Sequence, residues 1–158
     1  MREIEFKTRE DVDELVPHTG KMLLLDRVVR HDLENDVSIE TEVDIDENSM
    51  FYNAEEQGVP SYVAFEYMAQ SISALSGIYG RSIGQKPKEG FIMSVSNCKA
   101  DVPVFRAGDV VNIRVKQTMR VDMAVTFEGH VYVGDKLAVS ASLCTVEVDD
   151  PKSILKMA

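Results

Sequence analysis

Residues 60–80, PSYVAFEYMAQSISALSGIYG, are the stretch that decides the fold. Proline suits the first turn of a helix and glycine suits its end, so Pro60 and Gly80 predict a helix over residues 60–79. Nearly every face of this helix is apolar or small, which is typical of a buried helix. Glu66, Gln70 and several serines interrupt the apolar run, which excludes a membrane span.

Two strands and a short helix are predicted before this stretch. Residues 8–15 form the helix, because Thr8 can cap it, Asp11 has the capping-box spacing and Pro17 ends it. Residues 22–30 and 36–45 read as strands, and the second alternates apolar with polar positions. Residues 46–58 are rich in Asp, Glu and Asn, which is typical of a loop.

The part of the chain after residue 90 has the period-two pattern of β-strands. Four strands are predicted, at residues 90–98, 111–119, 123–133 and 137–143, with tight turns at residues 121–122 and 134–135. The whole order predicts a single α+β domain over residues 1–158, with an antiparallel sheet curled around a buried helix. This is the hotdog fold. One sheet cannot cover all sides of the helix, so a dimer is expected.

Composition excludes several classes of function. Seventeen Lys and Arg against 27 Asp and Glu give a net charge of -10, which disfavours nucleic-acid binding. Charged residues at the N-terminus argue against a signal peptide and predict a cytoplasmic protein. Cys98 and Cys144 are expected to be free thiols in a reducing compartment. The sequence lacks paired metal-ligand spacings and Gly-rich phosphate loops, so no metal or nucleotide cofactor is predicted.

A polar stripe on the predicted helix is the candidate for chemistry. Glu66, Gln70, Ser73 and Gly77 are spaced four, three and four residues apart and share one helix face. A carboxylate in an apolar helix is a candidate proton donor, although a structural Glu that bonds nearby backbone fits the pattern equally well. Free amides at the helix start can hold a carbonyl oxygen as it becomes an enolate, although ordinary hydration of a helix start is the simpler alternative.

Two motifs carry a family resemblance. Residues 17–28, PHTGKMLLLDRV, are similar to the opening motif of β-hydroxyacyl-(acyl-carrier-protein) dehydratases, and residues 60–70 look like the same family's Pro-Gly-Val-Leu-x-x-Glu-Ala-x-Ala-Gln helix. The likeness is strongest to the branch found in aryl polyene gene clusters. It implies a hotdog dimer that converts 3-hydroxyacyl groups on acyl carrier protein into trans-2-enoyl thioesters, in fatty acid or polyene biosynthesis, without a cofactor.

The resemblance also assigns roles. Glu66 matches the family's catalytic carboxylate, and Gln70 matches the polar residue one turn later. Ser61 matches the helix-start glycine whose amide polarises the thioester carbonyl, and the neighbouring amide of Tyr62 is expected to bind substrate with it. The family's catalytic histidine, supplied by the opposite subunit, has no counterpart, because Tyr52 stands near its position. His18 in the opening motif is therefore the candidate base, with a structural role for it as the alternative.

Other readings stay open. A hotdog thioesterase would use Glu66 to activate water, and a non-catalytic subunit would complete a heterodimer with a second hotdog chain. The carrier protein implied by the resemblance is acidic, as is this chain, so docking would need local cations. Arg81, Lys86 and Lys88 offer such a cluster, although a solvated loop fits them as well.

Overall fold

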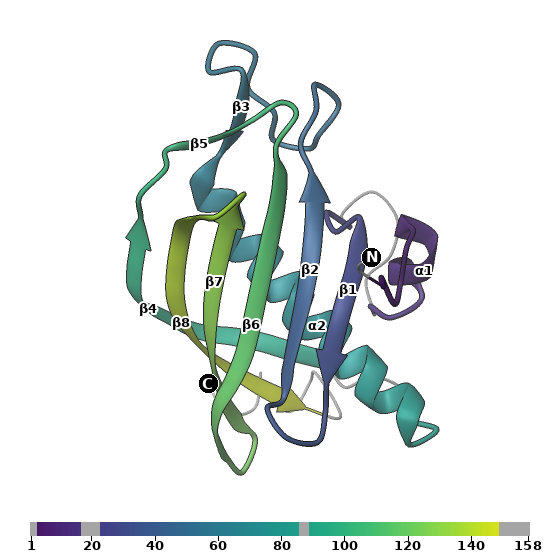
Figure 1. Cartoon of the computed structure of the whole chain (residues 1–158). Coiled ribbons are helices and arrows are strands. Elements are labelled where there is room, and N and C mark those ends of the chain that lie inside the picture. Colours follow the sequence, from purple (N-terminus) through teal and green to yellow (C-terminus); the bar gives the residue numbers. More distant parts are fainter. Residues whose placement is uncertain (1–2, 17–22, 86–88, 149–158) are drawn as a thin grey trace.

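The structure is a computed structural model that describes residues 3–16, 23–85 and 89–148. The elements in chain order are α1 (Arg9–Asp13), β1 (Arg27–Asp32), β2 (Ser38–Asp44), β3 (Gly58–Pro60), the 3-10 helix η2 (Ser61–Val63), α2 (Ala64–Ser82), β4 (Glu89–Ala100), β5 (Val104–Arg106), β6 (Val110–Val121), β7 (Ala124–Val133) and β8 (Lys136–Val148). Six strands form one antiparallel sheet in the order β1-β2-β6-β7-β8-β4, and β3 pairs with β5 at one end (Figure 1). The predicted α+β architecture is confirmed.

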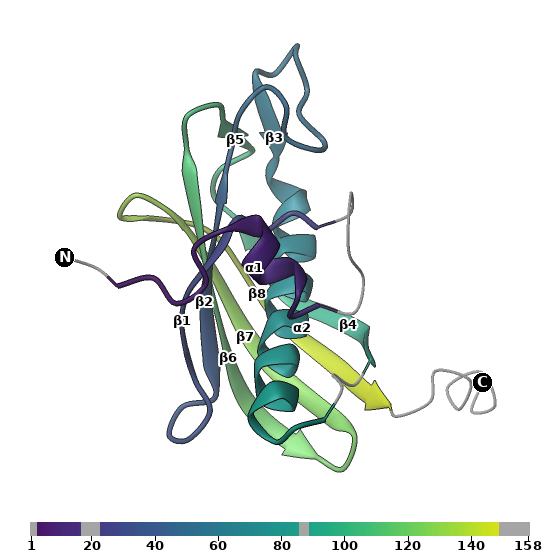
Figure 2. The same ribbon diagram turned by 90° about the vertical axis from the view of Figure 1, so that its right-hand side faces the viewer.

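The long helix α2 crosses the inner face of this sheet, and β4 and β8 curve around it (Figure 2). Apolar residues at helical spacing on α2 meet alternate residues of the strands, which buries both sets. The main contributors are Tyr67, Met68, Ala74, Leu75 and Ile78 from α2 and Val111, Ile113, Val115, Phe127, Val131, Ala141 and Leu143 from the sheet. Against Met68, Gly129 leaves the space that a side chain would fill.

The segment that includes α1 packs against α2. The predicted capping box is present: the Thr8 hydroxyl accepts a hydrogen bond from the Asp11 amide, and the Thr8 amide donates to the Asp11 carboxylate. The helix is shorter than predicted and ends at Asp13. Immediately after it, the backbone of Leu15 lies so close to Gly77 that a Cβ there would sit 1.8 Å from the Leu15 oxygen. Only glycine allows this approach.

The outer face of the sheet carries a network of ion pairs and hydrogen bonds. Glu40 and Glu42 are buried there, and the Asn112 side-chain amide donates to both carboxylates, at 2.9 and 3.1 Å. Arg30 pairs with Glu40 at 2.9 Å, and Arg27 pairs with Glu42 at 3.0 Å. The sequence predicts that β2 has one buried and one exposed face, but residues on both faces are buried, because these partners cover the polar face as well.

The main differences from the sequence predictions are two boundaries and one pair of strands. The helix α2 runs through Gly80 and ends in a Schellman motif, in which the Gln85 amide donates to the Gly80 oxygen and Gly84 has a positive φ of 68°. The first strand begins at Arg27 instead of residue 22. The pair β3 and β5 was not predicted, because three-residue strands are too short to show a period. Both predicted hairpin turns are confirmed, with positive φ at Asp122 and Gly134.

Within the described part of the chain, no helix is both long and apolar enough to span a membrane.

Candidate active site

The start of the long helix offers one backbone amide to a ligand. The amide of Ser61 donates to the Pro103 oxygen at 2.9 Å, so it is already occupied, contrary to the role expected of it. This bond was not predictable from the sequence, because Pro103 lies in the loop that leads into β5, a strand that was not predicted. Among the bonds that described residues make outside the helices and strands, none comes from the Tyr62 amide, and an N–H in the first turn of a helix has no acceptor within the helix. An N–H at a helix start carries partial positive charge, so the Tyr62 amide is the better candidate for holding an enolate oxygen.

Glu66 and Gln70 form a hydrogen-bonded pair on the next two turns. Gln70 Nε2 donates to Glu66 Oε1 at 3.1 Å, and the Leu24 amide donates to Gln70 Oε1 at 2.7 Å. Because a backbone N–H can only donate, the atom of Gln70 that faces Leu24 is its oxygen, and its NH₂ group must face Glu66. This donor occupies Oε1, so a proton carried by Glu66 resides on Oε2. The sequence predicted the shared face but not the Leu24 contact.

Glu66 is exposed in the single chain, which corrects the expectation that the carboxyl is buried. The sheet covers the side of α2 that carries Tyr67 and Met68, whereas Tyr62 is 68% exposed and Tyr79 is 53% exposed. The apolar pattern of the helix was correctly recognised, but it does not tell which chain covers each face. One face of α2 therefore lacks cover from its own chain among the described residues.

The two described histidines lie away from Glu66. His31 contacts the Glu5 carboxylate, and His130 pairs across the sheet with Arg114. His130 alternates with Gly129 and Val131, which face α2, so its side chain is on the outer face, as predicted. The candidate base His18 lies outside the described residues, so the structure does not place it.

Tyr52 lies in the loop before β3, half-buried against the core. Its neighbour Asn53 forms a bridge with Gly58, in which each amide donates to the other residue's oxygen. Gly58 is two residues before Pro60, so this bridge brings the Tyr52 loop to the N-terminal end of the helix. A substrate-binding role for Tyr52 stays a prediction.

The pKa values of Asp26 and of Tyr67 on α2 are both shifted. Burial raises the pKa of Asp26, while the Asp44 amide, which donates to its carboxylate at 2.7 Å, acts in the opposite direction. The guanidinium of Arg9 also lowers this pKa. Burial, and to a smaller extent the Asp26 charge, raises the pKa of Tyr67, which stacks against Phe105 with ring centroids 6.2 Å apart. Tyr67 therefore stays protonated and serves the core.

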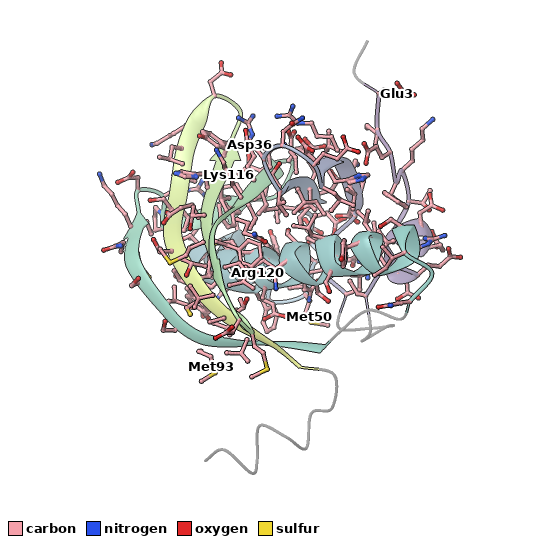
Figure 3. The ribbon with its side chains drawn as sticks, turned by 90° about the horizontal axis from the view of Figure 1, so that it is seen from below. Glu3, Asp36, Met50, Met93, Lys116 and Arg120 are labelled. Carbon is pink, nitrogen blue, oxygen red and sulfur yellow. The ribbon has the colours of Figure 1, made fainter. Side chains whose placement is uncertain are left out.

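Described residues line a cavity and a groove, neither of which includes Glu66 in its lining. An apolar cavity of about 350 Å³ lies between the C-terminal half of α2 and the sheet, with Leu75, Tyr79 and Phe127 in its lining. In Figure 3, Arg120, which also lines it, is seen close to α2. A groove on the outer face is lined by Arg30, His31 and His130, among others. No group of three or more His, Cys, Asp or Glu side chains in the described segments is arranged to hold a metal.

Comparison with known proteins decides the family. The family model of the ApeP-like dehydratases (ApeP dehydratase) matches residues 10–156. The chain belongs to the ApeP-like dehydratase family. This match covers α1 except for Arg9, the whole sheet and α2, so the resemblance read from residues 17–28 and 60–70 is confirmed over most of the ApeP-like chain.

Curated relatives and a solved structure agree with this assignment. The ApeP-like chain is 30% identical over 140 residues to the 3-hydroxyacyl-(acyl-carrier-protein) dehydratase FabZ of Caulobacter sp. strain K31, covering 87% of this chain and 83% of that protein. It is 27% identical over 139 residues to the FabZ of Rhizorhabdus wittichii, covering 86% of each. The dehydratase heterocomplex ApeI:P from Xenorhabdus doucetiae has a chain of the same fold, with a TM-score of 0.82, 21% identity and coverage of 92% and 95%.

Proposed function

We propose that this protein dehydrates 3-hydroxyacyl groups carried on acyl carrier protein. A base removes the proton alpha to the thioester carbonyl, and the Tyr62 amide holds the enolate-like oxygen. The C–O bond to the 3-hydroxyl then breaks as Glu66 Oε2 delivers its proton, so water leaves and a trans-2-enoyl thioester remains. The proton gained by the base returns to Glu66 through water, and no oxidant or cofactor is consumed.

The pair formed by Glu66 and Gln70, close to the amide of Tyr62 at the helix start, is the observation that carries this proposal. Gln70 fixes Oε1, which leaves the other oxygen available for proton transfer. When Glu66 gives up its proton, the new negative charge meets the N–H of Gln70 at once. Such prearranged donors favour the transition state over the bound substrate.

We propose His18 as the base. The described residues on both sides of its segment are attached to the polar stripe of α2: Leu15 contacts Gly77, and the Leu24 amide bonds Gln70. These two contacts, made by described residues that flank the segment, are what supports the choice of His18. By analogy with the family's use of opposite subunits, the imidazole that serves one Glu66 comes from the partner.

The dimer that this requires would form at β4 and the uncovered face of α2. The strand β4 is an edge of the sheet, and Ile92, Met93 and Val95 on it are exposed. An exposed apolar edge strand is a template for pairing with another strand. Pairing of two β4 strands would bring the exposed faces of two α2 helices together and exclude water from Glu66.

The test is dehydration of a 3-hydroxyacyl carrier-protein substrate, followed by the absorbance of the enoyl product. Glu66→Gln and His18→Ala should each lower kcat by about 10²–10⁴-fold, the range typical of general acids and bases. Glu56→Gln, in an exposed loop, and His130→Ala, on the outer face, are the matched controls and should retain full turnover. Release of free thiol from a plain acyl thioester, without enoyl absorbance, would replace this proposal by the thioesterase reading.

The positions of the described histidines favour a second candidate function, that of one subunit in a heteromeric dehydratase. Neither described histidine lies on the side of the sheet that holds Glu66, and Tyr52 stands near the position of the family's histidine. This chain could then supply one half of a heteromeric dehydratase whose imidazole belongs to a second hotdog chain. Wild-type protein that is inactive alone but active with such a chain, together with an unaffected His18→Ala variant, identifies this case.

The cytoplasmic location and the basic docking cluster remain predictions. Arg81 pairs with Glu14 at 3.9 Å, and Lys86 and Lys88 lie outside the described residues.

A further inference from the structure

A continuous chain of hydrogen bonds leads from α1 to the proposed acid. The guanidinium Nη2 of Arg9 donates to the Leu23 oxygen at 2.6 Å. The Leu24 amide donates to Gln70 Oε1 at 2.7 Å, and Gln70 Nε2 donates to Glu66 Oε1 at 3.1 Å. The Leu23 oxygen and the Leu24 nitrogen belong to one peptide group. The chain therefore consists of a cation, two amide groups in series and a carboxyl.

Both amides in this chain point the same way. Each presents its oxygen toward Arg9 and its N–H toward Glu66, so a positive charge at one end polarises both in the sense that favours negative charge at the other. Hydrogen bonds in series strengthen one another, by about 10–30% per bond. The charge of Arg9 thus strengthens the donor that Gln70 offers to Glu66.

We infer that Arg9 is a positioning residue for the proposed dehydration, acting on Glu66 through the Leu23–Leu24 peptide and Gln70. This inference rests on the proposed function. Arg9 holds the peptide, the peptide sets the orientation of the Gln70 amide, and that amide holds Oε1 and stabilises the carboxylate that appears when Oε2 gives its proton to the leaving hydroxyl. The effect is realised as charge develops, so it belongs in kcat and not in KM.

A double-mutant cycle separates this role from a purely structural one. Arg9→Met should lower kcat about three- to tenfold with KM unchanged, and should have no further effect in a Gln70→Leu background, because the connection is already broken there. Arg9→Lys keeps a cationic donor and should recover part of the loss. Arg81→Met is the matched control, because Arg81 also joins the α1 segment to α2 but lies outside this chain of bonds. Its effect should be the same in both backgrounds.

A further background, Asp26→Asn, is needed, because the Arg9 charge also acts on that carboxyl. In an Asp26→Asn background the effect of Arg9→Met should persist at full size. An equal loss from Arg9→Met with and without Gln70 would overturn the inference, as would disappearance of the loss when Asp26 is replaced. All comparisons are made on the active form of the protein, with its second hotdog chain where one is needed.

A spectroscopic readout keeps the inference testable without turnover. The side-chain NH₂ resonances of Gln70 should shift on Arg9→Met and stay in place on Arg81→Met. An unmoved Gln70 resonance in Arg9→Met shows that the connection does not exist. Absence of dehydration by the wild-type protein counts against the proposed function instead, and leaves this readout to decide the connection.

Discussion

Replacing Gly77 by alanine tests how α1 is attached to the helix that carries the site. A Cβ at this position would lie 1.8 Å from the Leu15 oxygen and 2.7 Å from the Leu15 carbonyl carbon. Both are backbone atoms, so no rotamer change can relieve the contact, and the segment must move by at least 1.2 Å to reach 3.0 Å. That movement also withdraws Leu15 from the core, where it is fully buried.

The expected cost follows from these terms. Overpacking costs about 1–3 kcal/mol and loss of a fully buried Leu costs about 1.5–3 kcal/mol, while alanine in a helix returns about 1 kcal/mol, so the net loss is about 1.5–5 kcal/mol. Urea unfolding of Gly77→Ala beside the wild type measures it. Gly129→Ala is the informative comparison, because its obstacle is the flexible Met68 side chain, with the sulfur 2.6 Å away, and its cost should be smaller. A Gly77→Ala protein as stable as the wild type would refute this packing.

Three further changes have defined outcomes. Asp26→Asn should raise the free energy of unfolding at neutral pH, because burial raises the Asp26 pKa and the ionised carboxylate therefore opposes folding. As the pH falls through the raised pKa toward 3.8, the stability of the wild type should approach that of the variant, which unfolding free energies measured against pH will show. Val95→Lys on the edge strand should leave single-chain stability unchanged but weaken self-association in analytical ultracentrifugation, whereas the exposed Met119→Lys should leave association intact; equal association in both would refute the β4 interface. Thr8→Ala removes the hydroxyl that accepts from the Asp11 amide and keeps the bond from the Thr8 backbone amide to the Asp11 carboxylate; it should lower the free energy of unfolding by about 1 kcal/mol, and an unchanged thermal midpoint would contradict the cap.

Local chemistry explains which elements were predictable from the sequence. The cap at Thr8 and the turns at Asp122 and Gly134 depend on residues only a few positions apart, so their pattern is visible in the sequence. The helix end was misread at Gly80 because any glycine near the end of an apolar run looks like a cap. The glycine that caps the helix is Gly84, whose positive φ depends on backbone hydrogen bonds that no sequence pattern reveals.

The site was predictable only in part, for the same reason. Spacing placed Glu66 and Gln70 on one face, and the structure joins them directly. The bond from Ser61 to Pro103 and the bond from Leu24 to Gln70 connect residues more than 40 positions apart, which spacing cannot show. The exposure of Glu66 was missed because hydrophobic periodicity reports that a face needs cover, without saying which molecule provides it.

The outer face of the sheet has a consequence for how a carrier protein approaches. Arg30 and Arg27 are matched by Glu40 and Glu42, and Lys116 is matched by Asp36 at 3.5 Å, the two residues labelled on this part of the sheet in Figure 3. Cations neutralised at such short range contribute little to the electric potential beyond a Debye length of about 8 Å in physiological salt. An acidic carrier therefore gains little long-range attraction from these three paired cations, and we expect its productive encounters to begin elsewhere on the molecule.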